Sequence, residues 1–116
     1  MNLNLDIYLS GYVQKLYKIK PSVIQKESEI TLRPEWWSLW RCEHLASDEE
    51  DKHVFVFTNA ASYFTILIFQ QGLLLDEMLL RFNQELLHRL GQFDFNLPKK
   101  VQAHTRIIKG NPRSLI

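Results

Sequence analysis

The chain has 116 residues, of which 46% are hydrophobic, with 14 Lys+Arg against 13 Asp+Glu, four histidines and one cysteine. This length suits one domain with a sizeable hydrophobic core, and the lone Cys42 excludes an intramolecular disulfide framework. The formal net charge of +1 argues against a dedicated nucleic-acid coat protein, and the lack of a long apolar run or a signal-peptide pattern favours a cytoplasmic protein without membrane spans.

The first third of the chain predicts a strand followed by a helix. Apolar and polar residues alternate over residues 2–7, which is the pattern of a half-buried strand. Ser10 is well placed to cap a helix that ends near Ile19, because the residue before Pro21 is pushed out of the helical conformation. Residues 22–34 are polar and weakly patterned, so we expect a surface connection there with at most a short extended piece.

Three strands are predicted in the middle of the chain. Aromatic residues and alternation after Trp37 indicate a strand that reaches Leu45 and turns Trp40 inward. Residues 53–58 and 62–69 are apolar on both faces, so we expect two central strands covered on both sides. One face then needs a helix, and the other needs a second helix, a returning segment or a partner chain.

The strongest helical pattern spans residues 73–90, and Gly91 is expected to end that helix. One apolar stripe should pack on the sheet, namely Leu75, Met78, Leu79, Phe82, Leu86 and Leu90. A second row recurs at seven-residue intervals, namely Leu73, Leu80 and Leu87. This second row either widens the core-facing stripe, which we favour, or forms a seam between subunits. Residues 101–108 form a final strand or a short helix.

These elements predict a single α+β domain over residues 1–116, without internal repeats. Their order is β-α-β-β-β-α-β. We expect a mostly antiparallel sheet of four to five strands, with the long helix of the C-terminal half packed on one face.

Motifs that identify common enzyme classes are missing from the sequence. It has no glycine-rich phosphate loop, no paired-cysteine motif, no His-Glu-x-x-His helix and no Gly-x-Ser-x-Gly elbow. Cys42 and His44 stand two residues apart like a nucleophile and its base, but the apolar neighbours of Cys42 favour a buried, unreactive thiol. We therefore expect no cofactor and no catalytic residues.

His44 and His53 are weak candidates for a metal site. They flank the acidic segment Asp48–Asp51, and a hairpin would bring the two imidazoles together, with carboxylates to complete a set of nitrogen and oxygen ligands. A metal-dependent hydrolase built on these histidines is the third function that we consider. A solvated acidic turn is the commoner explanation of such a segment.

Trp36, Trp37 and Arg41 are the leading candidates for contact with a protein partner. Adjacent indoles in a strand point to opposite faces, so we expect at least one to be partly exposed or at an interface, and tryptophan is enriched at binding hot spots. Packing in the core or at its rim is the alternative, and the commoner role of such aromatic residues. The alternative contact row is Leu73, Leu80 and Leu87. The sequence favours a non-enzymatic protein-interaction module, either a homodimer or a subunit that docks a protein partner, because it carries more large apolar groups than a small two-sided sheet would bury.

Basic residues gather after Pro98, where no acidic residue follows. They are Lys99, Lys100, Arg106, Lys109 and Arg113. Lysine and arginine near a chain end can contact phosphates without reading base sequence. A nucleic-acid-associated regulator is therefore the second function that we consider, and a solubilising terminus is its alternative.

Five short motifs stand in a fixed order along most of the chain, namely Lys15–Pro21, Trp40–Leu45, Val56–Asn59, Tyr63–Ile68 and Asn111–Ser114. Together they resemble an uncharacterised bacterial family, the domain-of-unknown-function 6933 type. This sequence departs from the family pattern at Arg41, Cys42 and Glu43, where the family has His, Ala and Asn. The resemblance implies a single bacterial cytoplasmic α+β domain and supplies no catalytic residues.

Overall fold

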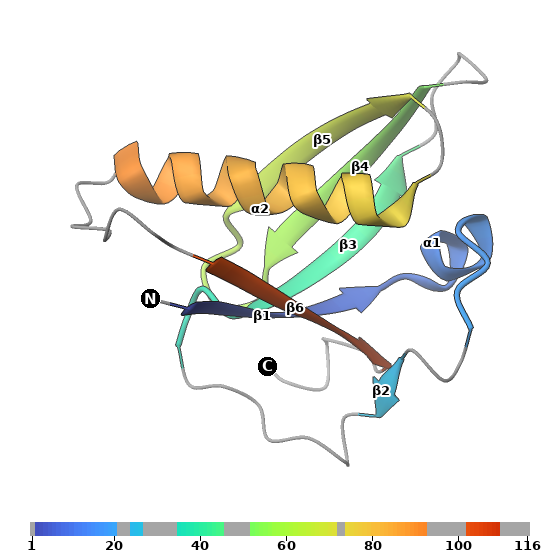
Figure 1. The fold of residues 1–116 in the computed structure, drawn as a ribbon, viewed down its shortest axis with the longest axis horizontal. Coiled ribbons are helices and arrows are strands. Elements are labelled where there is room, and N and C mark those ends of the chain that lie inside the picture. Colours follow the sequence, from blue (N-terminus) through green and yellow to red (C-terminus); the bar gives the residue numbers. More distant parts are fainter. Residues whose placement is uncertain are drawn as a thin grey trace.

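The computed structural model describes residues 2–20, 24–26, 35–45, 52–71, 74–92 and 102–109. The elements in these ranges are β1 (Asn2–Leu9), α1 (Gly11–Leu16), β2 (Gln25–Lys26), β3 (Leu39–Leu45), β4 (Lys52–Asn59), β5 (Thr65–Gln71), α2 (Leu75–Gln92) and β6 (Gln102–Lys109). Figure 1 shows the long helix α2 lying across the sheet. The predicted α+β class and element order are confirmed, with the two-residue β2 as an addition.

All six strands belong to one sheet, in the order β2-β6-β1-β3-β4-β5. β1 runs parallel to both of its neighbours, and β2 runs parallel to β6, whereas β4 is antiparallel to β3 and to β5. The expectation of a mostly antiparallel sheet is therefore wrong, because the sheet is mixed. Long stretches of sequence separate β1 from β3 and β5 from β6, and parallel pairing requires such crossovers, whereas only a few residues separate β4 from each of its antiparallel neighbours.

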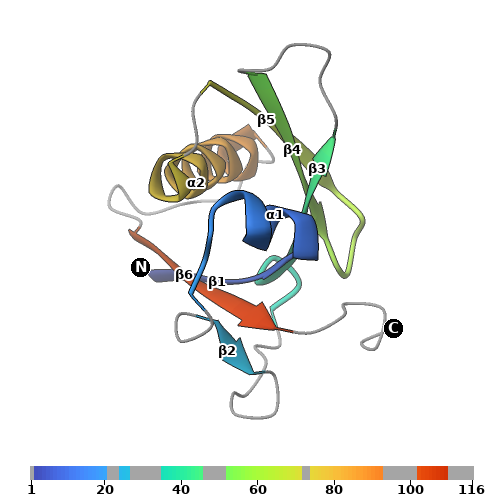
Figure 2. The ribbon, with the colours of Figure 1, turned by 90° about the vertical axis from the view of Figure 1, so that its right-hand side faces the viewer.

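Both helices cover the same face of the sheet. Val13 of α1 and two residues of α2, Met78 and Phe82, are fully buried in one cluster with Trp40 and Phe57. The ring of Phe82 stacks on Phe57 with 4.0 Å between centroids and meets Trp40 edge-on at 5.1 Å. Figure 2 shows α1 and α2 on the same side of β3, β4 and β5.

α1 begins where the sequence predicts and ends earlier. The hydroxyl of Ser10 accepts a hydrogen bond from a first-turn amide at 3.2 Å, which is the predicted N-cap. The helix ends at Leu16 and not near Ile19, because Lys18 adopts a left-handed φ of 51°. The amide of Ile19 then donates to the carbonyl of Gln14 at 3.1 Å, the closing bond of a Schellman motif.

α2 starts and ends two residues later than predicted, so Gly91 lies inside its last turn and does not end it. Four residues of the predicted stripe are buried, namely Met78, Phe82, Leu86 and Leu90. Leu75 and Leu79 are partly buried against the same core. Neither of the described helices is long and apolar enough to cross a membrane.

The central and edge positions in the sheet differ from those expected. β1 lies between β6 and β3 and is buried on both faces, since Leu5 and Ile7 are fully buried on the helix side and Asp6 and Tyr8 are each 1% exposed on the other face. β5 is an edge strand and not a central one. Its helix-side residue Ile66 is 4% exposed, whereas Leu67 and Phe69 on the other face are 48% and 67% exposed.

Candidate functional site

An apolar surface crosses β3, β4 and β5 on the side away from the helices. The register sets Leu45 beside Val54 and Val54 beside Phe69, so one row of side chains spans three strands. The next row sets Val56 beside Leu67. We call these five side chains the open face. Leu45, Leu67 and Phe69 are exposed, and Val54 and Val56 are half-buried between them. A contiguous exposed apolar patch marks a site of interaction.

The outer edge of β5 presents main-chain groups that β4 does not use. The amide of Asn59 donates to the carbonyl of Phe64 at 2.8 Å, which fixes the phase of the antiparallel ladder. Hydrogen-bonded and non-hydrogen-bonded pairs alternate along such a ladder, so the N–H and C=O groups of the even-numbered residues of β5 point toward β4. Thr65, Leu67 and Phe69 therefore turn their N–H and C=O groups outward.

β5 lacks the sequence features that usually prevent an edge strand from pairing with another chain. The strand reads Thr-Ile-Leu-Ile-Phe-Gln-Gln, without a charge, a proline or a glycine to blunt it. One outward carbonyl, that of Phe69, accepts a hydrogen bond from the guanidinium of Arg81 at 2.9 Å. Leu67 stands at the middle of the edge with its side chain exposed.

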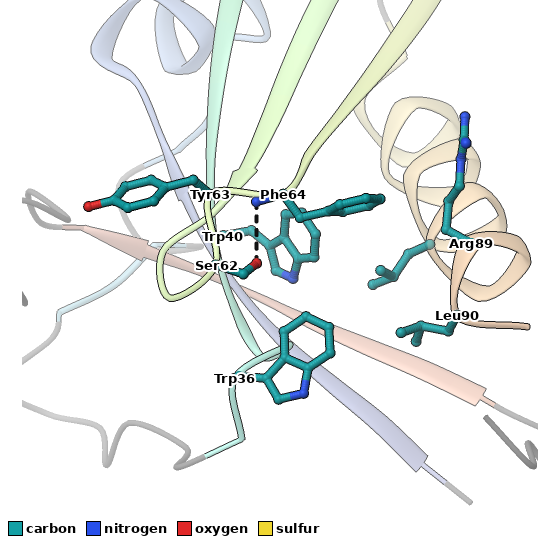
Figure 3. Close-up of a pocket in the computed structure, with 8 residues that line it drawn as sticks. Trp36, Trp40, Ser62, Tyr63, Phe64, Arg89 and Leu90 are labelled. Carbon is teal, nitrogen blue, oxygen red and sulfur yellow. Dashed lines mark hydrogen bonds between the residues drawn. The ribbon is translucent and has the colours of Figure 1, made fainter. Parts of the chain in front are cut away.

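A pocket of about 430 Å³ opens between the C-terminal half of α2, the β4–β5 turn and the turn before β3. Four aromatic residues, Trp36, Trp40, Tyr63 and Phe64, line the pocket together with two leucines of α2. Figure 3 shows the Phe64 ring pointing toward α2, whereas the Tyr63 ring points the opposite way. Its volume lies within the range of small-molecule sites.

Asn59 links the turn before β3 to the β4–β5 turn, which form two walls of the pocket. Its side chain is fully buried, and its Nδ2 donates to the carbonyl of Trp36 at 2.7 Å. Its Oδ1 accepts from the amides of Ala61 and Ser62 at 3.0 and 2.9 Å and from the Ser62 hydroxyl at 3.0 Å. Tyr63 follows at a φ of 61°, a conformation that a residue with a Cβ keeps only where its surroundings hold it. One side chain thus positions both turns.

Arg89 is the charged residue among the described lining of the pocket. Its Nε donates to a carboxylate oxygen of Glu85, one helical turn earlier, at 2.9 Å. The terminal amino groups of Arg89 have no hydrogen-bond partner among the described residues. Figure 3 shows this guanidinium on the opposite side of the pocket from Trp36.

His44 and His53 come together on the paired strands β3 and β4. His44 Nε2 lies 3.0 Å from His53 Nδ1, and the ring of Tyr12 stacks on His44 with 5.0 Å between centroids. Burial lowers the pKa of His44, and the neighbouring His53 lowers it further. Within the described ranges, no group of three or more metal-ligating side chains occurs, and Asp48–Asp51 lies outside those ranges.

The core beneath α1 keeps two weak acids protonated. Cys42 is fully buried, and burial, with a smaller contribution from Glu43, raises the pKa of its thiol well above the ordinary value. Burial, with a smaller contribution from Cys42, raises the pKa of Tyr17 to about 12. A protonated, buried thiol is a poor nucleophile, so Cys42 has a packing role.

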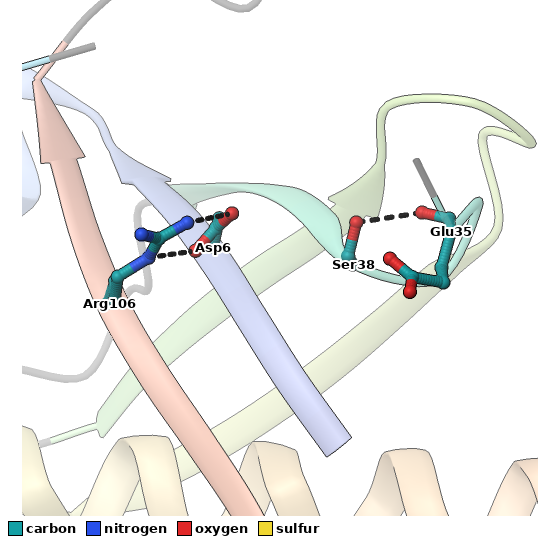
Figure 4. Close-up of polar contacts among 4 residues, drawn as sticks. All are labelled: Asp6, Glu35, Ser38 and Arg106. Carbon is teal, nitrogen blue, oxygen red and sulfur yellow. Dashed lines mark hydrogen bonds and ion pairs between the residues drawn. The ribbon is translucent and has the colours of Figure 1, made fainter. Parts of the chain in front are cut away.

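A buried ion pair joins β1 to β6. Arg106 donates from two nitrogens to the two carboxylate oxygens of Asp6, at 2.7 and 2.8 Å, and the Asp6 side chain is 1% exposed (Figure 4). The hydrogen bonds from Arg106 to Asp6, together with the charge of Asp6, raise the pKa of Arg106. Figure 4 also shows Ser38 donating to the carbonyl of Glu35, at 2.7 Å, in the turn before β3.

The predicted contact residues near Trp36 lie in two places. Trp36 is 40% exposed at the pocket, and Trp37 meets it edge-on, with 5.8 Å between centroids, while it packs partly against the core. Both stand in the turn before β3, so the expectation that strand geometry points them to opposite faces is wrong. Arg41 lies on β3 beside the open face, where its Nε is 3.2 Å from a carboxylate oxygen of Glu43.

The second leucine row and the basic segment are only partly described. Leu80 is 55% exposed, whereas Leu87 is partly buried against the core, and Leu73 lies outside the described residues. Among the basic residues, Arg106 pairs with Asp6, and Lys109 ends β6. The other three lie outside the described residues, namely Lys99, Lys100 and Arg113.

Three residues that shape these surfaces do not stand out in the sequence, namely Leu67, Phe69 and Asn59. An apolar run gives no sign of whether its strand lies at the centre or the edge of a sheet. The Asn-Ala-Ala-Ser stretch that begins with the last residue of β4 predicts a turn, but it does not predict the hydrogen bond from Asn59 to Trp36 across 23 residues. No protein-family model, curated protein or solved structure matches the chain.

Proposed function

We propose that the chain is a non-enzymatic protein-interaction module that forms a homodimer by pairing β5 with β5 of a second copy. The observation that carries this proposal is the outward direction of the main-chain groups of Thr65 and Leu67 on an exposed, uncharged edge strand. Addition of a strand to such an edge is a common mode of protein recognition, in which main-chain hydrogen bonds supply affinity. The same edge left bare is a site of uncontrolled aggregation.

The chemistry of β5 favours a second copy over an unrelated strand. The strand has no charged side chain, so it offers no ion pair that would select a partner of opposite charge. Antiparallel pairing about a two-fold axis at Leu67 sets this residue against its counterpart and sets Thr65 against the counterpart of Phe69. Each outward N–H then meets an outward C=O. Self-complementary two-fold contacts are the commonest way in which identical chains associate.

The open face adds apolar area to this pairing. Leu67 and Phe69 are about half and two thirds exposed, and both side chains lie on the same side of the joined sheet. In the dimer the row of Val56 and Leu67 meets the same row of the second copy at the axis. Cross-strand apolar pairs stabilise a sheet by roughly 0.2–1 kcal/mol each.

Sedimentation velocity on the full chain tests the proposal. We expect wild-type protein to sediment as a dimer and Leu67→Lys to sediment as a monomer, because two like charges would meet at the axis. Leu80→Lys is the matched control, since Leu80 is also an exposed leucine, at 55%, but lies on α2. It should remain a dimer.

The outcomes separate the two candidate surfaces. A wild-type monomer contradicts the proposal. If the dimer persists in Leu67→Lys and is lost in Leu80→Lys, the dimer contact lies at the second leucine row, which contains Leu80. Circular dichroism of each variant shows that the fold is retained, as the exposure of both leucines predicts.

The other functions stay predictions with less support from the described residues. The charge of Arg106 compensates the buried Asp6, which reduces its use as a phosphate contact. The histidine pair supplies two of the three or more ligands that a metal-dependent hydrolase needs. The family resemblance, a bacterial origin and a cytoplasmic location are likewise predictions.

A further inference from the structure

We propose that the pocket beside Trp36 binds a small aromatic anion, of which an aryl carboxylate is the simplest form. This site is separate from the dimer contact proposed above, because its described lining includes none of the outward-facing residues of β5. Either proposal can fail while the other holds.

The walls of the pocket suit a flat ring. The indole of Trp36 and the ring of Phe64 come from different turns, and the buried Trp40 lies between them. Leu86 and Leu90 of α2 complete an apolar surface opposite these rings. Aromatic pairs gain from offset or edge-on contact beyond the area that they bury, so these walls favour an aromatic ligand over an aliphatic one of equal size.

The pocket is formed before a ligand arrives. Asn59 donates to the carbonyl of Trp36 and accepts three hydrogen bonds from the Ala61–Ser62 segment, so the two turns cannot move independently. Tyr63 is held at a positive φ by the same turn. A binding site that is already ordered loses less conformational entropy on binding, which raises affinity for a small ligand.

Charge selects an anion over a cation. Arg89 is the charged residue in the described lining, and Glu85 engages only its Nε. The terminal amino groups of Arg89 can therefore donate to a carboxylate held beyond the aromatic ring. Hydrogen bonds from a guanidinium to a carboxylate are about twice as strong as neutral ones. A ligand with an ammonium group would face this guanidinium with a like charge.

Isothermal titration calorimetry with three probes that share one ring tests the proposal. The probes are indole-3-acetate, indole and tryptamine, which are anionic, neutral and cationic at pH 7. We expect indole-3-acetate to bind about tenfold more tightly than indole, the factor that one charged hydrogen bond supplies, and tryptamine to bind most weakly.

Three variants locate the binding. Arg89→Gln should reduce the affinity for indole-3-acetate to that for indole and leave the affinity for indole unchanged. Trp36→Ala should weaken both probes about tenfold, while its main chain still accepts the hydrogen bond from Asn59. Arg81→Gln is the control, because it removes a positive charge from α2 at a residue that does not line the pocket. This control should bind like wild type.

Each contrary result overturns the proposal. Equal affinity for the three probes would show that Arg89 does not bind the ligand carboxylate. A preference for the anion that persists in Arg89→Gln would show the same. Binding that Trp36→Ala leaves unchanged places the probes elsewhere. The absence of heat with all three probes at millimolar concentration shows that the pocket takes no aromatic anion, whatever the oligomeric state.

Discussion

The guanidinium of Arg81 on α2 donates a hydrogen bond to the main-chain oxygen of Phe69 on β5, at 2.9 Å. The guanidinium approaches this carbonyl from the outer edge of β5. This agrees with the strand register, which also points the N–H and C=O groups of Leu67 outward. A carbonyl oxygen has two lone pairs, so the contact leaves Phe69 able to accept from a further strand. The helix that covers one face of the sheet thus supports an edge that remains able to pair.

The dimer proposal predicts that a proline at position 67 abolishes association without unfolding the chain. Proline has no N–H, and an outward position on an edge strand is one that tolerates it. Leu67→Pro should be folded and monomeric, whereas Leu67→Ala, which keeps the N–H, should form a weaker dimer. Light scattering combined with thermal unfolding measures both properties. A proline variant that still dimerises would exclude strand pairing.

The strained end of α1 predicts a gain in stability at Lys18. Lys18 is exposed, and its φ of 51° costs a residue with a Cβ roughly 1–2 kcal/mol, which glycine does not incur. Lys18→Gly should raise the free energy of unfolding by about 1 kcal/mol, measured by urea denaturation. Lys18→Ala keeps the Cβ and should give no gain. Equal effects of the two substitutions would show that the strain is absent.

The ion pair between β1 and β6 predicts an asymmetric loss of stability. Arg106→Met leaves the carboxylate of Asp6 buried without its counter-charge and should cost about 3 kcal/mol of unfolding free energy. Asp6→Asn removes the buried negative charge, and the partly exposed guanidinium of Arg106 can still be hydrated. The free energy of unfolding should therefore fall by only about 1–2 kcal/mol. Denaturant unfolding of both variants at pH 7 makes the comparison.

The double variant Asp6→Asn with Arg106→Met is the control for this asymmetry. It has no uncompensated buried charge, so it should be more stable than Arg106→Met alone. A double variant less stable than either single variant would show that the two side chains stabilise the fold by packing and not through their charges.

The histidine pair predicts that stability falls in mild acid. The pKa of His44 in the folded state lies below its ordinary value of 6.5, because of burial and then of His53. The unfolded chain therefore binds more protons, so the free energy of unfolding decreases as the pH falls below about 6.5 and levels off below the folded-state pKa. Thermal unfolding from pH 8 to pH 5 should show this decrease.

His44→Gln should remove that part of the pH dependence, and His88→Gln, which replaces an exposed histidine of α2, is the matched control. A pH profile that is the same in wild type and His44→Gln would exclude His44 as its source.

Periodicity predicted most of the elements because it reports local burial. The spacing of Met78, Phe82 and Leu86 identified the helix that covers the sheet. Periodicity does not report neighbours, so the parallel pairing of β1 with β6 across about 100 residues was not predictable. The edge position of β5 was missed for the same reason, since Leu67 and Phe69 look like core residues in the sequence.

The candidate sites were predictable where chemistry is local. The hairpin hypothesis anticipated the approach of His44 and His53. The tryptophan cluster was singled out without a choice between its indoles, and Trp36 is the one that is exposed. The hydrogen bonds of Asn59 depend on a turn that is distant in the sequence, and the cation of Arg89 reaches the pocket only through the packing of α2 on the sheet. Neither the hydrogen bonds of Asn59 nor the position of Arg89 at the pocket can be predicted from a local sequence pattern.

Amide hydrogen exchange along β5 tests strand pairing most directly. In a monomer only the even-numbered amides bond to β4, whereas in the dimer the amide of Leu67 is also bonded. At concentrations where the dimer forms, we expect Leu67 to exchange as slowly as Ile66 and to lose this protection on dilution. Rapid exchange of Leu67 beside a protected Ile66 at every concentration would contradict the account.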